Sequence, residues 1–165
     1  HEHDEMKIIK NFIEEKDYKN IKETIFSDSF PWYFYEESVT NIPVPQFVHM
    51  MFWQQKLFSN NYSLLVPILN KLNPLALYKI KLNLNYKTET VIETGEHIDL
   101  DNKNFLSAVF FLNNCDGYCR IKDEKVYSED NKIVIFNSNE KHTGTTTSNS
   151  SRRIVINIIY LPYES

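Results

Sequence analysis

The chain changes its hydrophobic period about halfway along its length. From Met6 to about Ser27, apolar residues recur at helical spacing and charged residues fall on the other side. A second helical stripe follows Asn61, a residue type that favours the start of a helix, and runs to Leu72. Between them, residues 47–53 could form a strand or a short buried segment. The pattern therefore predicts two helices in the first part of the chain.

From Leu75 onward the period becomes two. Leu77 to Asn85 alternates apolar and polar residues over a long strand, and Phe105 to Leu112 is a nearly continuous apolar run. Further strands are expected at 118–121, 125–127, 132–136 and 153–160. Helices followed by about seven strands predict a mostly β fold, with N-terminal helices packed on a β-sandwich.

Length and composition are consistent with a single domain. A chain of 165 residues can bury a sizeable core, and its 14% aromatic residues suit broad β-sheet faces. We expect residues 6–165 to form this domain, with 6–74 as helical and irregular support for a β core at 75–161. Residues 1–5 precede Met6 and are expected to be a cloning remnant or a disordered segment.

Composition also narrows the function classes. Only three glycines are present, which argues against a glycine-rich phosphate loop, and a net charge of −4 argues against a nucleic-acid partner. Lys79, Lys81 and Lys87 alternate with apolar residues, which we interpret as the solvated face of a strand. Cys115 and Cys119 lack the second pair of a zinc site and are interpreted as free thiols. No run approaches the ~20 apolar residues of a membrane span, so a cytoplasmic protein without a membrane partner is expected.

A spaced set of polar residues in the β region carries candidate metal chemistry. His97 and Asp99 lie two apart at a strand edge, so both side chains can project to one side and reach one ion. His142 follows after about four short strands, which can bring it to face the first pair. Two histidines and one carboxylate form the facial triad that holds ferrous iron and leaves positions open for oxygen and a cosubstrate. Asp101 is a less favoured alternative to Asp99.

The last strand adds a candidate anion site. With period two, one face carries Arg153 and Asn157, and the other carries Arg152. Asn157 is the only polar residue from Ile154 to Ile159, and a cavity that contains a polar ligand explains why it shares a face with Arg153. We therefore favour Arg153 as the residue that binds a carboxylate and keep Arg152 as the alternative. Both could also be ordinary surface residues at a strand end.

Residues 77–160 resemble the double-stranded β-helix (jelly-roll) core of the Fe(II)- and 2-oxoglutarate-dependent dioxygenases. They are most similar to the prolyl-hydroxylase-like branch and to small oxygenase-like proteins of marine phages and bacteria. The segments that carry the resemblance are 97–99, 107–113, 117–121, 135–136 with 142–144, and 153–160. The resemblance implies an oxidoreductase that hydroxylates an unidentified small-molecule or peptidyl substrate and releases succinate and carbon dioxide.

The resemblance also implies roles for individual residues. His97, Asp99 and His142 would hold Fe(II), and Arg153 would pair with the distal carboxylate of 2-oxoglutarate. Further cosubstrate contacts are expected from residues on neighbouring strands: Asn83, Asn85, Val109, Phe111 and Asn157. Phe111 departs from the prolyl-hydroxylase pattern, which often places a tyrosine hydroxyl near that carboxylate.

Two other functions remain open at this point. A metal-binding cupin-like protein usually supplies an extra histidine near the first pair, and none is present here. A non-catalytic β-sandwich accessory protein predicts that neither metal nor 2-oxoglutarate changes stability, because only a ligand of the native state raises it. His49, beside Phe47, is interpreted as a buried core histidine with satisfied hydrogen bonds.

Overall fold

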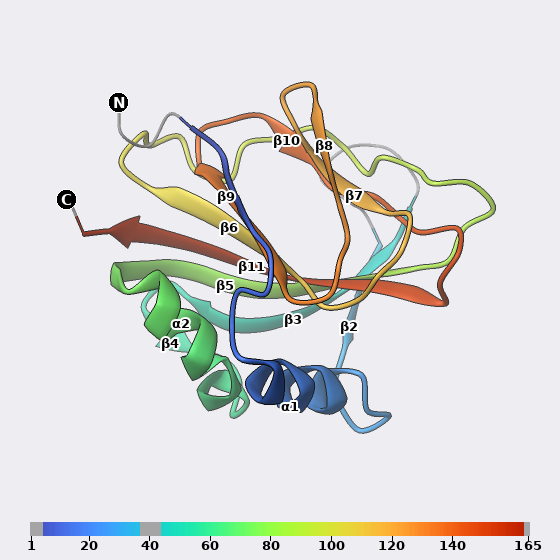
Figure 1. Ribbon diagram of the computed structural model, residues 1–165, viewed down its shortest axis with the longest axis horizontal. Helices are drawn as coiled ribbons and strands as arrows, with labels where there is room; N and C mark the ends of the chain where they lie inside the picture. The colour runs from blue at the N-terminus through green and yellow to red at the C-terminus, as the bar shows by residue number, and fades with distance from the viewer. Residues whose placement is uncertain (1–4, 37–43, 164–165) are drawn as a thin grey trace.

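Two antiparallel sheets that face each other make up most of the structure, a computed structural model that describes residues 5–36 and 44–163 (Figure 1). Of residues 1–5, only Glu5 lies within the described residues. The main sheet has the strand order β1-β9-β6-β11-β5-β3-β2, and β4 pairs with β3. Its strands are β1 Lys7–Ile9, β2 Tyr33–Tyr35, β3 Gln46–Trp53, β4 Lys56–Leu57, β5 Pro74–Tyr86, β6 Leu106–Phe111, β9 Lys132–Asn137 and β11 Arg152–Pro162.

The second, smaller sheet consists of β10 (His142–Thr143), β7 (Tyr118–Ile121) and β8 (Glu124–Tyr127). Isolated bridges join residues 87–97 to residues 142–147 and extend this sheet by one more chain segment. Side chains from both sheets form one buried cluster: Val109, Phe111, Cys119, Ile121, Val126, Val134, Phe136 and Val155. The arrangement is a mostly β sandwich of two sheets, as the strand pattern predicts.

Helices cover the other face of the main sheet: α1 (Glu15–Ile25), the 3-10 helix η1 (Tyr62–Leu65) and α2 (Val66–Leu72) (Figure 1). The Tyr18 hydroxyl of α1 donates a hydrogen bond of 2.6 Å to the backbone oxygen of Leu112, just after β6. The larger hydrophobic core lies at this helix–sheet interface and includes Tyr18, Ile21, Ile25, Ile68, Leu69, Ile80, Leu82, Ile154, Ile156 and Ile158.

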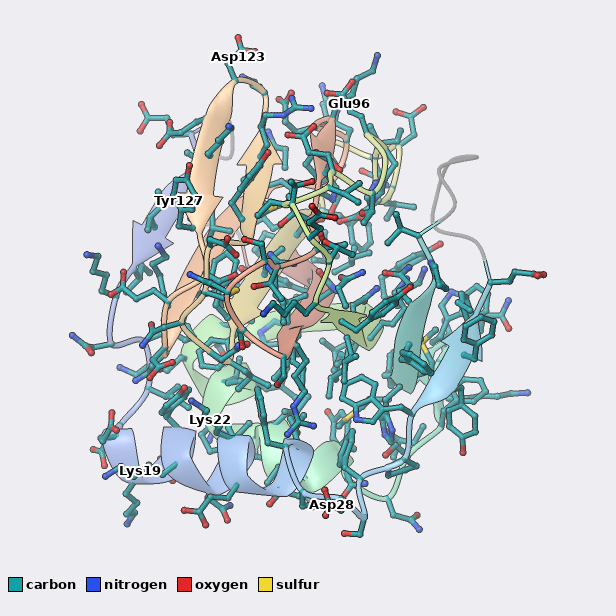
Figure 2. The ribbon with its side chains drawn as sticks, turned by 90° about the vertical axis from the view of Figure 1, so that its right-hand side faces the viewer. Lys19, Lys22, Asp28, Glu96, Asp123 and Tyr127 are labelled. Carbon is teal, nitrogen blue, oxygen red and sulfur yellow. The ribbon has the colours of Figure 1, made fainter. Side chains whose placement is uncertain are left out.

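A view turned by 90° shows the same layers from the side. Lys19 and Lys22 mark α1 at one end of the molecule, and Asp123, in the turn between β7 and β8, marks the other (Figure 2). The main sheet is therefore covered on both faces, and the smaller sheet forms the outer wall on the side away from the helices. No helix in the described part of the chain is both long and apolar enough to cross a membrane.

The first helix begins later than the apolar spacing predicts. Lys7–Ile9 form β1, which pairs with β9 at the edge of the main sheet. Ile8 and Ile9 are 42% and 39% exposed, so their spacing does not reflect burial on a helix face. Asn11 has φ of 50°, in the left-handed region, which interrupts any helix at that point. Edge pairing of the backbone thus outweighs the helical period here.

The segment expected to be helical and irregular support also contributes to the sheet. Residues 46–53 form β3, which lies beside β5 and is one of the longer strands. The second helical stripe is divided between η1 and α2, and Pro67 lies in the first turn of α2, where its missing N–H costs little. From β5 to β11, each predicted strand is present with bounds that differ by at most three residues.

Candidate metal centre and adjoining cavity

His97 and His142 are brought together by the smaller sheet. The backbone N–H of each donates to the backbone oxygen of the other, at 2.9 Å in both directions. This antiparallel pair places the two rings side by side, with their centroids 4.4 Å apart. Asp99 follows two residues later, and its backbone N–H donates to the oxygen of Ser138 at 3.0 Å. Backbone hydrogen bonds therefore position all three side chains.

The three side chains converge on one point. Asp99 Oδ1 lies 3.4 Å from His97 Nε2 and 3.3 Å from His142 Nε2. The three potential ligand atoms lie within 4.8 Å of one another, and among the described residues this is the only such group of histidine, cysteine or acidic side chains. Asp101, the alternative ligand, is exposed and outside the group.

Hydrogen bonds orient each ligand. His97 Nδ1 lies 2.9 Å from the oxygen of Gly95, and His142 Nδ1 lies 3.0 Å from the oxygen of Glu140. A carbonyl oxygen can only accept a hydrogen bond, so both Nδ1 atoms carry the hydrogen. The lone pairs of both Nε2 atoms are therefore left for a metal. The second oxygen of Asp99 accepts a hydrogen bond of 2.7 Å from the Ser107 hydroxyl, which leaves Oδ1 for the ion.

The electrostatics of the three groups are coupled. Burial by itself raises the pKa of Asp99, but hydrogen bonds and charge from His142 and His97 outweigh burial and hold this pKa well below its ordinary value. For His142, burial lowers the pKa, and the hydrogen bond and charge of Asp99 reverse this and raise it. The carboxylate is therefore ionised and ready to bind a cation.

A cavity of about 100 Å³ adjoins the three residues, between the two sheets. That volume would hold several water molecules, since one needs roughly 10–15 Å³. The lining comes mainly from alternate residues of β5 and β11, with further residues from β3, β6 and the smaller sheet. The lining residues are Gln46, Lys79, Lys81, Asn83, Asn85, Thr94, His97, Asp99, Val109, Cys119, His142, Gly144, Arg153, Val155, Asn157 and Ile159.

Arg153 is buried at one end of this cavity, with 2% of its surface exposed. Its Nε donates to the Ser128 hydroxyl at 2.8 Å, and its Nη1 donates to the backbone oxygen of Thr145 at 3.2 Å. Among the described residues no carboxylate pairs with the guanidinium. Burial lowers the pKa of Arg153, yet an arginine keeps its proton in a protein. A buried charge without a counterion indicates an anion-binding position.

Asn85 supplies a second unpaired donor at the same end. It lies directly opposite Arg153 in the pairing of β5 and β11, and it is 4% exposed. Its Nδ2 is buried and has no hydrogen-bond partner. Thr145, which accepts from Arg153, is three residues beyond His142, or about 10 Å of extended chain. The distance between the anion position and the three metal-binding candidates is therefore about the length of a short organic acid.

Arg152 points elsewhere. Its Nη2 donates to the backbone oxygen of Phe26 at 3.1 Å, and its guanidinium lies 4.6 Å from the centre of the Phe26 ring, on the helix side of the sheet. Of the two arginines left open by the sequence, only Arg153 lines the cavity.

Most of the other expected cosubstrate residues also line the cavity. Asn157 Nδ2 donates to Asn83 Oδ1 at 2.7 Å, and Asn83 Nδ2 donates to Gln46 Oε1 at 3.0 Å, so three amides form a chain across β11, β5 and β3. Val109 is part of the lining. Phe111 is not: it is fully buried, with its ring centre 5.8 Å from the Arg153 guanidinium, and supports that side chain instead.

The interpretation of Lys79 and Lys81 as a solvated face was wrong. Both are half-buried and line the cavity, on the same side of β5 as Asn83 and Asn85. An alternating strand has the same pattern whether its polar face meets water or a polar cavity under a second sheet. The polar lining also includes Gln46 and Thr94, which no pattern singled out.

His49 is a satisfied core histidine, as expected. Its Nδ1 lies 2.8 Å from the oxygen of Pro31 and its Nε2 lies 2.7 Å from the Ser59 hydroxyl. Both cysteines are free thiols.

Other proteins of known structure share this fold. No protein-family model and no curated protein matches the sequence. Among solved structures, the α-ketoglutarate-dependent epimerase SnoN of nogalamycin biosynthesis matches with a TM-score of 0.68 and 12% identity, over 98% of this chain and 79% of SnoN. The chain has the fold of the 2-oxoglutarate- and Fe(II)-dependent oxygenases.

Two prolyl hydroxylases share this oxygenase fold. The enzyme of Trichoplax adhaerens matches with a TM-score of 0.62 and 13% identity, over 95% of this chain and 83% of its own. The prolyl-4-hydroxylase of Pseudomonas putida matches with a TM-score of 0.58 and 15% identity, over 94% and 92%. A common fold does not fix the reaction, as an epimerase and two hydroxylases show. The resemblance to marine phage proteins stays a prediction.

Proposed function

We propose that this chain is an Fe(II)- and 2-oxoglutarate-dependent oxygenase that hydroxylates a small-molecule or peptidyl substrate, with release of succinate and carbon dioxide. One observation carries the proposal. The histidine–carboxylate group at His97, Asp99 and His142 shares a cavity with the buried guanidinium of Arg153, which no carboxylate of the described residues pairs with, and with the unpaired Nδ2 of Asn85. A metal chelated at one end and a carboxylate held at the other are what a keto diacid requires.

The residues present fit the metal. His97 Nε2, His142 Nε2 and Asp99 Oδ1 are the atoms that would hold Fe(II), because the remaining polar atoms of these side chains are engaged elsewhere. When bound, Fe(II) supplies the redox chemistry of oxygen activation and open positions for the keto acid. The protein's part is to fix the ligand geometry, which the backbone pair between His97 and His142 and the Ser107 hydroxyl accomplish.

The residues present also fit the cosubstrate. Arg153 would form charge-assisted hydrogen bonds to the distal carboxylate, and Asn85 Nδ2 would donate a further one. Both groups gain, because the Arg153 charge has no counterion among the described residues and Asn85 Nδ2 has no hydrogen-bond partner. Val109 and Val155 close the cavity with apolar surface, which excludes water and strengthens the ion pair. The amide chain from Asn157 to Gln46 keeps the remaining polar wall fixed.

Hydroxylation is the outcome we propose because two of the compared enzymes that share the fold are prolyl hydroxylases. Their names describe those proteins; for this chain the prolyl-hydroxylase-like specificity remains part of the proposal. A buried arginine without a counterion lowers stability unless a ligand offsets the cost of burying its charge. Arg153 therefore argues against a non-catalytic sandwich that binds no anion.

A thermal unfolding experiment tests the proposal. With Mn(II) in place of Fe(II), 2-oxoglutarate at 100 times its Kd should stabilise the folded chain by about 2.7 kcal/mol. Arg153→Ala should abolish this stabilisation. Arg152→Ala is the matched control and should preserve it, because Arg152 lies on the helix side. Equal stabilisation of both variants, or none in the unmodified chain, would contradict the proposal.

A further inference from the structure

Two lysines in the cavity have no role in holding the metal or the cosubstrate as described above. Lys79 and Lys81 belong to the same face of β5 as Asn83 and Asn85, and both are half-buried in the lining. Burial, and then the neighbouring charge of Lys79, lower the pKa of Lys81, whereas Asp99 raises it. Two neighbouring ammonium groups are therefore partly shielded from water.

Neither ammonium group has an acidic hydrogen-bond partner among residues 5–36 and 44–163. The Lys79 ammonium lies 5.1 Å from the centre of the Trp53 ring, on the adjacent strand. Asp99 is the only acidic residue of the described chain in the lining, and its oxygens already contact the two histidines and Ser107. Two like charges in a partly desolvated site cost free energy that an anion would recover.

The lysines lie at the opposite end of the cavity from Arg153. On β5, Lys81 is four residues from Asn85, the partner of Arg153, which corresponds to about 13 Å, and Lys79 is six residues away, or about 20 Å. Lys79 is paired with Ile159, and Ile159 is paired on its other side with Ser107, the residue that donates to Asp99. The metal-binding group therefore lies at the lysine end of the cavity, away from Arg153.

The charges of the cavity lining also indicate separate positions for the cosubstrate and for a second anion. Among the described residues, the lining contains three cationic side chains and one carboxylate, apart from the histidines. A divalent metal and the dianion 2-oxoglutarate cancel each other, so an excess of two positive charges remains when both are bound. Arg153 accounts for the distal carboxylate of the cosubstrate, and Lys79 and Lys81 lie at the end of the cavity that holds the metal-binding group, where a substrate must approach.

We infer that Lys79 and Lys81 bind an anionic group of the substrate, a carboxylate, phosphate or sulfate, and hold the neighbouring carbon toward the metal. The inference rests on the proposed oxygenase function and narrows its substrate to anionic molecules. Both lysines can reach the same anion, because side chains two apart on a strand share a face. Asn157 on β11 is paired with Lys81 on β5 and offers a further polar contact beside the lysines.

Sulfate is a suitable probe, since it carries two negative charges and binds ferrous iron weakly. The anaerobic Fe(II) and 2-oxoglutarate complex is titrated with sodium sulfate, with sodium chloride at equal ionic strength as reference. Emission of Trp53, isolated by Trp32→Phe, reports the lysine end because Lys79 lies over that ring. The charge-transfer absorption of the iron–keto-acid complex is recorded in the same samples and reports the proposed function independently.

The unmodified chain should show a saturable change in Trp53 emission, and Lys81→Gln should weaken it by at least about tenfold. Lys81→Arg should retain it, because the charge is kept. Lys87→Gln is the matched control on the exposed end of the same segment and should behave as the unmodified chain. In all variants the charge-transfer band should persist.

Other results overturn the inference in distinguishable ways. If sulfate binds equally in Lys81→Gln, or not at all while the band is normal, the lysines do not bind an anion and the oxygenase proposal stands. If sulfate removes the band, or Lys81→Gln weakens 2-oxoglutarate binding, the lysines belong to the cosubstrate site. If the unmodified chain forms no band, the proposed function fails and the inference fails with it.

Discussion

Asn85 lies directly opposite Arg153 on the neighbouring strand, and its buried amide nitrogen has no hydrogen-bond partner. The arginine beside it has no carboxylate partner among the described residues. A buried charge without a counterion and an unsatisfied donor beside it are both costly, and together the two groups match the two oxygens of one carboxylate.

Asn85→Ala should lower 2-oxoglutarate affinity by about tenfold, since one hydrogen bond to a charged group is lost. The ligand-free variant should be no less stable than the unmodified chain, because an unpaired buried donor has been removed. Asn85→Asp should abolish binding altogether, as its carboxylate would occupy Arg153. Calorimetric titration of the Mn(II)-loaded protein measures both affinities. Unchanged affinity in Asn85→Asp would show that the carboxylate is held elsewhere.

Gly117→Ala should displace Arg153. A Cβ at this position would overlap the arginine Cδ and would lie 2.7 Å from the backbone oxygen of Thr146, closer than a Cβ approaches another heavy atom. Crowding of this kind costs roughly 1–3 kcal/mol in a packed interior. We expect a lower melting temperature and weaker 2-oxoglutarate binding. Gly144→Ala is the matched control, because its Cβ would meet the same arginine at an ordinary 3.7 Å. Equal effects of the two substitutions would refute this account of Gly117.

Ser107→Ala should weaken metal binding without touching a metal ligand. The serine hydroxyl donates a hydrogen bond of 2.7 Å to Asp99 Oδ2. Loss of a hydrogen bond that orients a metal ligand typically lowers metal affinity by about 10–100-fold. Competition with a chelator measures the affinity. Ser63→Ala, at an exposed serine of η1, should leave it unchanged. A Ser107→Ala protein with full metal affinity would mean that Asp99 is oriented by its backbone alone.

The two thiols should differ in reactivity. Burial raises the pKa of Cys119 to about 12, which the charge of Arg153 only partly offsets, so almost no thiolate forms near pH 8. Cys115 is partly exposed. Ellman's reagent should therefore titrate one thiol rapidly in the native protein and two after denaturation. Rapid reaction of both thiols in the native state would show that the sandwich opens at Cys119.

The candidate site was largely predictable because it follows strand periodicity. Residues two apart share a side, which places His97 with Asp99 and Arg153 with Asn157, and the alternation of β11 alone separates Arg153 from Arg152. The strands from β5 onward have strong period-two patterns, and their bounds differ little from expectation.

What the sequence could not reveal depends on long-range contacts. The polar face with Lys79 and Lys81 is indistinguishable from a solvated face until the smaller sheet covers it. Strand β1 exists because the edge of β9 offers backbone hydrogen bonds, a cause more than 100 residues away in the chain. Phe111 shares a strand face with Val109, yet it lies under the guanidinium rather than in the cavity lining, which only packing decides.

The most direct test of the oxygenase proposal is an anaerobic visible spectrum of the protein with Fe(II), before and after 2-oxoglutarate is added. A charge-transfer band should appear in the unmodified chain and be absent in His97→Ala, because chelation of the keto acid requires iron at this site. If the folded protein binds Fe(II) and forms no band, the metal centre does not use 2-oxoglutarate, and the proposed function is wrong.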